Sequence, residues 1–206
     1  MKKIPEIRIS YGWLVADTAS EVLNEKWGDG TALRTIEEYQ AIAQKYEEWW
    51  KPFNDQILQA MCDTFGLEFR QSIIDIYVVP WFYAISDPMI IGPGFETQDA
   101  VVNTLTHELL HRLLTDNTAT NHGHDFLKDW RQLFGDLPFN TLVHIPVHAG
   151  MKNIYSNVVN RPDLLEMDMK DMADNPDYAN AWKYVEEHDY KKIIHKLRKQ
   201  YGTIAS

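Results

Sequence analysis

The stretch HELLHRLLTDNTATNHGHDF, residues 107–126, contains a zinc-binding signature and is the segment that best indicates the fold. His107 and His111 are four residues apart, so on an α-helix their imidazoles project from one face and can bind one metal ion. Glu108 follows the first histidine, where a carboxylate can take a proton from a water molecule on the metal. Chance produces an H-E-x-x-H match only about 0.02 times in a chain of this composition. We therefore expect Zn²⁺ as cofactor and Glu108 as general base.

A catalytic zinc normally has three protein ligands, so the motif needs a third residue. His122 and His124 follow a turn that is long enough to return the chain to the metal. His144 and His148 are four residues apart and would come from a later helix. Glutamate does not occur again until residue 166, which favours a site of three histidines. The residues alone leave all four histidines open as the third ligand.

The segment 107–130 resembles the SprT-like zinc metallopeptidases, in which the motif helix is followed by a loop and an HGxxF element. The matching positions are His107, Glu108, His111, His122, Gly123 and Phe126. The resemblance implies that His122 is the third zinc ligand and that the chain hydrolyses peptide bonds in a peptide or protein substrate. The small gluzincin-like peptidases are a second resemblance. They imply a third ligand from a later helix, where His144 and His148 lie.

Composition limits the classes of partner. The formal net charge is −10 and the sequence pI is about 5.2, so the average surface repels nucleic acid and anionic lipid. Among the functions that the resemblance implies, a DNA-associated protease is therefore the less expected one. The basic stretch KKIIHKLRKQ, residues 191–200, is attributed to the exposed face of a terminal helix.

The expected location is the cytoplasm. Cys62 is the only cysteine, so no disulfide can form within the chain. The N-terminal residues lack the apolar core of a signal peptide, and no apolar run is long enough to cross a bilayer. No motif specifies an oligomeric state.

The expected fold class is α+β: a mostly helical, zincin-like single domain, 1–206, with a small antiparallel sheet before the motif helix. Its length and its 45% hydrophobic residues suit one core. Periodicity predicts a helical N-terminal region over residues 1–70, strands within 72–94, a motif helix 97–115 and C-terminal helices within 124–201. Within that last region, the acidic residues 161–177 are expected to be irregular. Pro146 is expected in the first turn of its helix.

Further roles are assigned as hypotheses. Residues that could orient the ligand imidazoles are Asp116, Asn117, Asp125 and Asp129. His148 could instead donate a hydrogen bond to an oxyanion. The aromatic stretch PWFYAISDP, residues 80–88, lines a substrate cleft or belongs to the core. The alternative function is a non-catalytic, metal-stabilised helical interaction protein, in which His124 or His148 closes the site as a fourth ligand.

Overall fold

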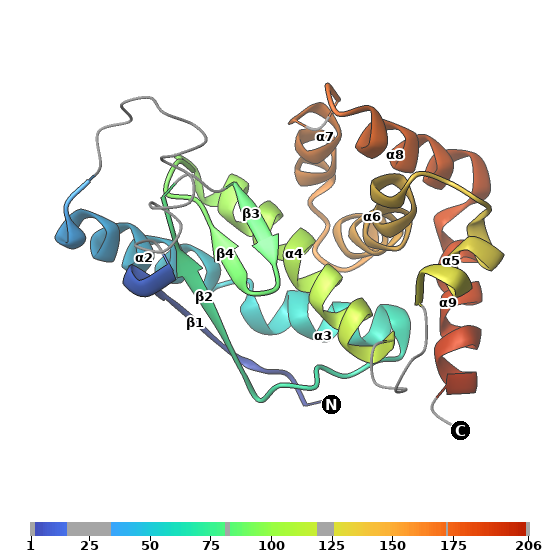
Figure 1. Cartoon of the computed structure of the whole chain (residues 1–206), viewed down its shortest axis with the longest axis horizontal. Helices are drawn as coiled ribbons and strands as arrows, with labels where there is room; N and C mark the ends of the chain where they lie inside the picture. Colours follow the sequence, from blue (N-terminus) through green and yellow to red (C-terminus); the bar gives the residue numbers. More distant parts are fainter. Residues whose placement is uncertain (1–2, 16–33, 81–82, 119–125, 172, 205–206) are drawn as a thin grey trace. The chain divides into compact units, whose positions relative to one another are not determined.

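The computed structural model describes residues 3–15, 34–80, 83–118, 126–171 and 173–204 (Figure 1). Contacts divide the chain into two compact units. Unit 1 comprises residues 1–4, 55–70 and 109–206, and unit 2 comprises residues 5–54 and 71–108. The division falls inside one uninterrupted helix, α4 (Gln98–Thr118), between Glu108 and Leu109.

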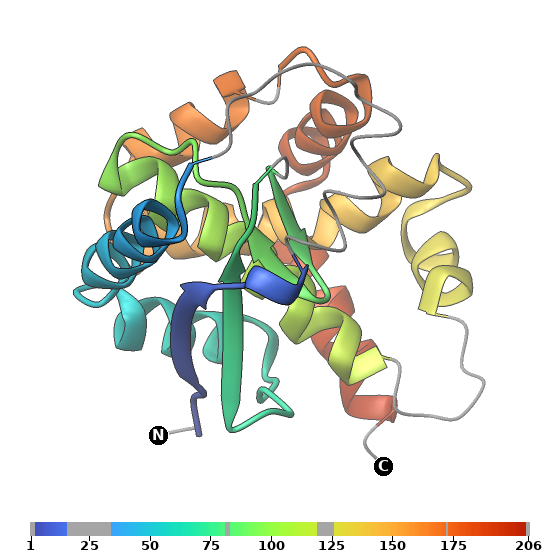
Figure 2. The ribbon, with the colours of Figure 1, turned by 60° about the vertical axis from the view of Figure 1, so that its left-hand side comes forward.

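Unit 2 contains a four-stranded sheet in the order β1-β2-β4-β3 (Figure 2). The strands are β1 (Glu6–Tyr11), β2 (Ile73–Val78), β3 (Ala84–Ser86) and β4 (Met89–Ile91). β1, β2 and β4 run parallel, and only β3 is antiparallel, to β4. The α+β class with a small sheet before the motif helix is confirmed. The expectation of an antiparallel sheet was wrong, because only the β3–β4 pair is antiparallel and the other pairs are parallel.

Strand β1 lies within residues 1–70, which the sequence predicts to be a helical region. Its parallel pairing with β2 explains how it was missed, because parallel strands need a long crossover and their partners are distant in the sequence. Here the crossover includes α2 (Ile36–Trp50), which contacts both strands. Thr35 caps α2 in a capping box with Glu38, whose carboxylate accepts the Thr35 N–H at 2.6 Å.

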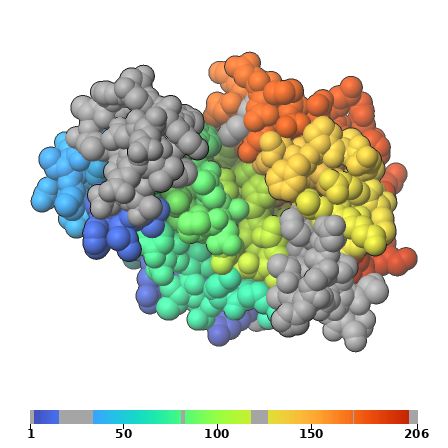
Figure 3. Space-filling model, viewed as in Figure 1, coloured from blue at the N-terminus to red at the C-terminus, as the bar shows by residue number. Residues whose placement is uncertain are grey.

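Unit 1 is helical. Its helices besides the end of α4 are α3 (Asn54–Phe65), α5 (Phe126–Phe134), α6 (Phe139–Asn157), α7 (Pro162–Asp171), α8 (Pro176–His188) and α9 (Tyr190–Ile204). Helix α6 is the centre of the unit, because it contacts α5, α7, α8 and α9. Figure 3 shows α5 and the beginning of α6, in yellow, at the surface, and Phe139 at the first position of α6 is 54% exposed. From Thr141 to Met151 every side chain of α6 is buried.

Glycines follow the last turns of two of these helices. Gly66 follows α3 with φ +74°, and Gly135 follows α5 with φ +99°. Both angles lie in the left-handed region, which glycine adopts without the steric cost of a Cβ atom.

Two expectations for unit 1 were wrong. Helix α6 begins at Phe139, so Pro146 lies inside it and not in its first turn. Its missing N–H leaves the carbonyl of Leu142 without the usual helical donor, and burial among four helices holds α6 together around the proline. Residues 162–171 form α7, where an irregular segment was expected. Leu164 and Asp168 are its buried residues, one turn apart, and the acidic composition conceals this single inward face.

Among the described residues, no helix combines the length and the apolar character needed to cross a membrane.

Candidate metal centre

Helix α4 positions the H-E-x-x-H motif. The hydroxyl of Thr97 accepts the N–H of Ala100 at 3.2 Å, so Thr97 caps the N-terminus of this helix. The apolar side of the helix is fully buried, from Val101 to Leu113. His107 and His111 lie one turn apart; His107 is 5% exposed, and His111 and Glu108 are partly buried. The helix therefore presents both imidazoles on one face, as the spacing predicts.

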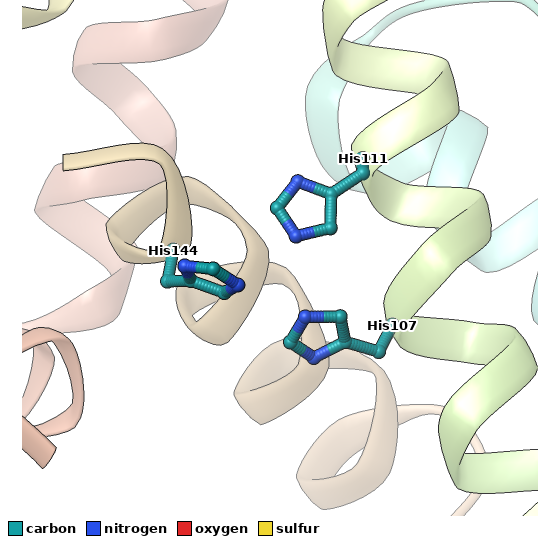
Figure 4. A group of neighbouring side chains, drawn as sticks. All are labelled: His107, His111 and His144. Carbon is teal, nitrogen blue, oxygen red and sulfur yellow. The ribbon is translucent and has the colours of Figure 1, made fainter. Parts of the chain in front are cut away.

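Helix α6 brings His144 to the same place. The ligand nitrogens of His107, His111 and His144 all lie within 4.8 Å of one another. Figure 4 shows the three imidazoles converging, two from α4 and one from α6. His111 and His144 belong to unit 1, and His107 precedes the first α4 residue of that unit by two positions on the same continuous helix.

A backbone hydrogen bond fixes the tautomer of His144. Its Nδ1 lies 2.5 Å from the carbonyl oxygen of Asn140. A carbonyl can only accept, so Nδ1 carries the proton and the lone pair of the neutral ring is on Nε2. His144 is thus prepared to bind a metal through Nε2. Tyr178 packs against its ring at 3.8 Å between centroids, which restricts the ring further.

A second buried group adjoins the first. His107, His148 and Asp168 have ligand atoms within 4.8 Å of one another, and their side chains are 5%, 0% and 2% exposed. The indole Nε1 of Trp182 donates a 2.9 Å hydrogen bond to Oδ2 of Asp168. The ring of Trp182 also stacks on His148, with centroids 4.2 Å apart and planes 8° from parallel. His107 is the residue that the two groups share.

Burial sets the charge of these side chains. It lowers the pKa of His111 to about 3, with a further contribution from His144, and it lowers the pKa of His144 to about 4. The pKa of His148 falls well below its usual value for the same reason. These three rings are neutral at pH 7, so each keeps a lone pair that a metal ion can use. Burial also raises the pKa of Glu108 to about 8.

The predicted site residues have different outcomes. His107, Glu108 and His111 lie on α4 as expected, and His144, one of the rival third ligands, joins the two histidines. His122 and His124 lie in residues 119–125, outside the described residues. His122 therefore stays a prediction of the sequence.

Two of the four residues expected to orient the ligands have other partners. Asp116 forms an ion pair with Arg112 at 3.0 Å, and the amide of Asn117 donates to backbone oxygens of Leu113 and Glu68. Asp129 lies in the first turn of α5. Asp125 falls outside the described residues.

Asp168 is a residue of the cluster that the sequence motifs do not predict. The signal that reveals it is the four-residue step from Leu164, which places both on one face if the segment is helical.

No protein-family model, no curated protein and no solved structure matches this chain. Its function is therefore inferred from the geometry and chemistry of the metal centre.

Proposed function

We propose that this protein is a zinc-dependent hydrolase that cleaves peptide bonds, with His107, His111 and His144 holding the metal and Glu108 as general base. The observation that carries the proposal is the convergence of His144 on the two motif histidines. The H-E-x-x-H spacing alone provides two ligands, and α6 provides a third imidazole with its lone pair fixed on Nε2.

The donor set fits zinc. Three neutral imidazoles are borderline-soft nitrogen donors, and a catalytic zinc keeps a fourth position open. Nitrogens bound to one tetrahedral zinc at about 2.1 Å are about 3.4 Å apart. The 4.8 Å limit on the spacing of the three ligand atoms is close enough for small side-chain rotations to reach that value. When bound, zinc polarises a carbonyl and lowers the pKa of a water molecule.

Glu108 contributes proton transfer. Its carboxylate oxygen can take a proton and then give it to the amine that leaves when a peptide bond breaks. In the metal-free protein, burial raises the pKa of this carboxyl to about 8, so that it holds a proton at neutral pH. A cation bound by the neighbouring histidines favours the ionised form that accepts the proton first.

Other features support the same chemistry. The resemblance of residues 107–130 to SprT-like peptidases points to peptide substrates, and a cytoplasmic location is part of the proposal because Cys62 is a buried thiol outside any disulfide. A DNA-associated role is disfavoured by the net charge of −10.

The test is hydrolysis of a fluorogenic peptide library by the zinc-loaded protein. Glu108→Gln should retain zinc and lose at least about 100-fold in turnover, since it removes the base and leaves the ligands. Glu47→Gln, at another helical glutamate, is the matched control and should leave turnover unchanged. A Glu108→Gln protein that cleaves at the wild-type rate would refute the mechanism.

The second candidate is a non-catalytic protein in which the metal only stabilises the helices. The observation that favours it is the burial of His148, Asp168 and His107, a ligand set closed to water. It predicts a zinc-loaded wild-type protein that cleaves no member of the library, so the same experiment separates the two functions.

A further inference from the structure

A buried carboxylate stands next to the metal centre and comes from a helix that contributes no ligand. Asp168 on α7 is 2% exposed, and its nearest ionisable neighbours in the cluster are His107 and His148. Burial of a carboxylate is costly unless it accepts hydrogen bonds. Trp182 donates one of them, at 2.9 Å to Oδ2. An ionised carboxylate has about four acceptor positions, so it can also receive an imidazole N–H.

His107 has its two ring nitrogens on opposite sides. In Figure 4 one nitrogen faces His111 and the other faces away from it. A histidine that binds a metal through one nitrogen carries a proton on the other, and this N–H needs an acceptor when it is buried. The carboxylate of Asp168 is within 4.8 Å of a His107 nitrogen and is an acceptor of the required kind.

We propose that Asp168 is a positioning residue of the metal centre: it accepts the N–H of His107 and so holds that ring with its lone pair toward His111 and His144. Trp182 holds the carboxylate, and its stacking on His148 fixes the indole in turn. His144 has the equivalent support from the carbonyl of Asn140. Two ligands from two helices are therefore each oriented by an acceptor, one a carboxylate and one a backbone oxygen. This inference rests on the proposed metal centre and adds a residue to it.

The competing role for Asp168 is that of a direct ligand, with His148 and His107, to a separate ion. The two roles differ in stoichiometry. A positioning residue leaves one metal per chain and changes its affinity, whereas a ligand of a second ion removes one of two metals when it is replaced.

The experiment titrates Co²⁺ into the metal-free full chain and records the dissociation constant, the stoichiometry and the visible spectrum. Asp168→Asn should bind one Co²⁺ per chain about 10- to 100-fold more weakly than wild type, with the bands of a three-histidine site retained. Trp182→Phe keeps an aromatic ring stacked on His148 and removes the N–H that donates to Asp168, so this variant should also bind Co²⁺ more weakly than wild type. Asp171→Asn, an exposed carboxylate on the same helix, should bind like wild type.

A second readout does not require metal. Imidazole ¹⁵N shifts of the metal-free protein should show His107 protonated on the nitrogen that faces away from His111, and Asp168→Asn should lower the population of that tautomer. Trp182→Phe keeps the test decisive if Asp168→Asn does not fold.

Three outcomes would contradict the positioning role of Asp168. Wild-type affinity and tautomer in Asp168→Asn would overturn the positioning role while leaving the proposed metal centre intact. Loss of one of two bound ions would overturn it in favour of a separate site. A wild-type chain that binds no Co²⁺ would overturn both the proposed function and this inference.

Discussion

At the scale of single residues, the metal centre brings several neutral imidazoles together in the protein interior. His111, His144 and His148 all have lowered pKa values, and burial is the first cause for each. Uncharged rings do not repel one another, and each retains a lone pair. The cost of the arrangement appears when the metal-free protein is acidified, because the unfolded chain then binds protons that the folded protein does not.

We expect the metal-free protein to lose stability between pH 6.5 and about pH 4.5. In that window an unfolded histidine is protonated, whereas His111 and His144 have pKa values of about 3 and about 4 when folded. Each histidine lowers the free energy of unfolding by about 1.4 kcal/mol for each pH unit of acidification. Glu108 acts in the opposite sense, since its pKa of about 8 means that the folded protein already holds this proton. The histidines outnumber it, so the net effect is a loss.

Urea unfolding in EDTA at pH 6.5 and pH 5.0 measures this dependence. His144→Leu should reduce the dependence of the free energy of unfolding on pH by about 1.4 kcal/mol per pH unit, the contribution of one histidine. A stability that stays constant or rises on acidification would contradict the assignment of buried, neutral histidines.

At the scale of helices, α6 lies close to its neighbours because of one glycine. A Cβ atom at Gly150 would lie 2.9 Å from Cε2 of Phe65, closer than real Cβ contacts come, and 3.1 Å from Cδ2 of Leu110, which is a tight contact. Phe65 ends α3 and Leu110 lies on α4 beside the motif. The absence of a side chain at this position lets α6 carry His144 to the motif histidines.

Gly150→Ala should therefore destabilise the protein, although alanine favours helices. Overpacking of a buried contact costs about 1–3 kcal/mol, more than the helix propensity of alanine returns. Urea unfolding measures the change. Ser156→Ala, at an exposed position of the same helix, should stay within about 0.5 kcal/mol of wild type. A Gly150→Ala protein at least as stable as wild type would show that α6 has room to spare.

Helices with strong local signals were predictable, and those without were not. The capped motif helix, and the helices that end at Gly66 and Gly135, follow from periodicity and end signals. Strand β1 depends on a parallel partner far along the chain, and α7 buries only Leu164 and Asp168. Neither carries a local pattern that distinguishes it.

The same division applies to the metal centre. His107 and His111 follow from spacing within one helix. The choice of His144 depends on where α6 begins and how it packs. Pro146 lies inside α6, and a proline in the sequence normally indicates the start of a helix, so the true start is not evident locally. Asp168 requires recognition of α7 itself. Single-helix geometry is encoded locally, whereas the meeting of three helices is a property of the packed unit.

At the scale of the whole molecule, a metal that binds only the folded chain must stabilise it. Free Zn²⁺ at 100 times its dissociation constant should raise the free energy of unfolding by about 2.7 kcal/mol. Thermal unfolding with Zn²⁺ and with EDTA measures the difference. Mg²⁺, which prefers oxygen ligands, should have no comparable effect. Equal midpoints in Zn²⁺ and EDTA would mean that the histidines bind no zinc.

The central claim is that α6 supplies the third ligand, and metal analysis of purified variants tests it most directly. Wild type and His122→Ala should each contain one zinc per chain, and His144→Ala should lose most of it. Full zinc content in His144→Ala together with loss in His122→Ala would contradict the claim and restore the ligand that the sequence resemblance implies.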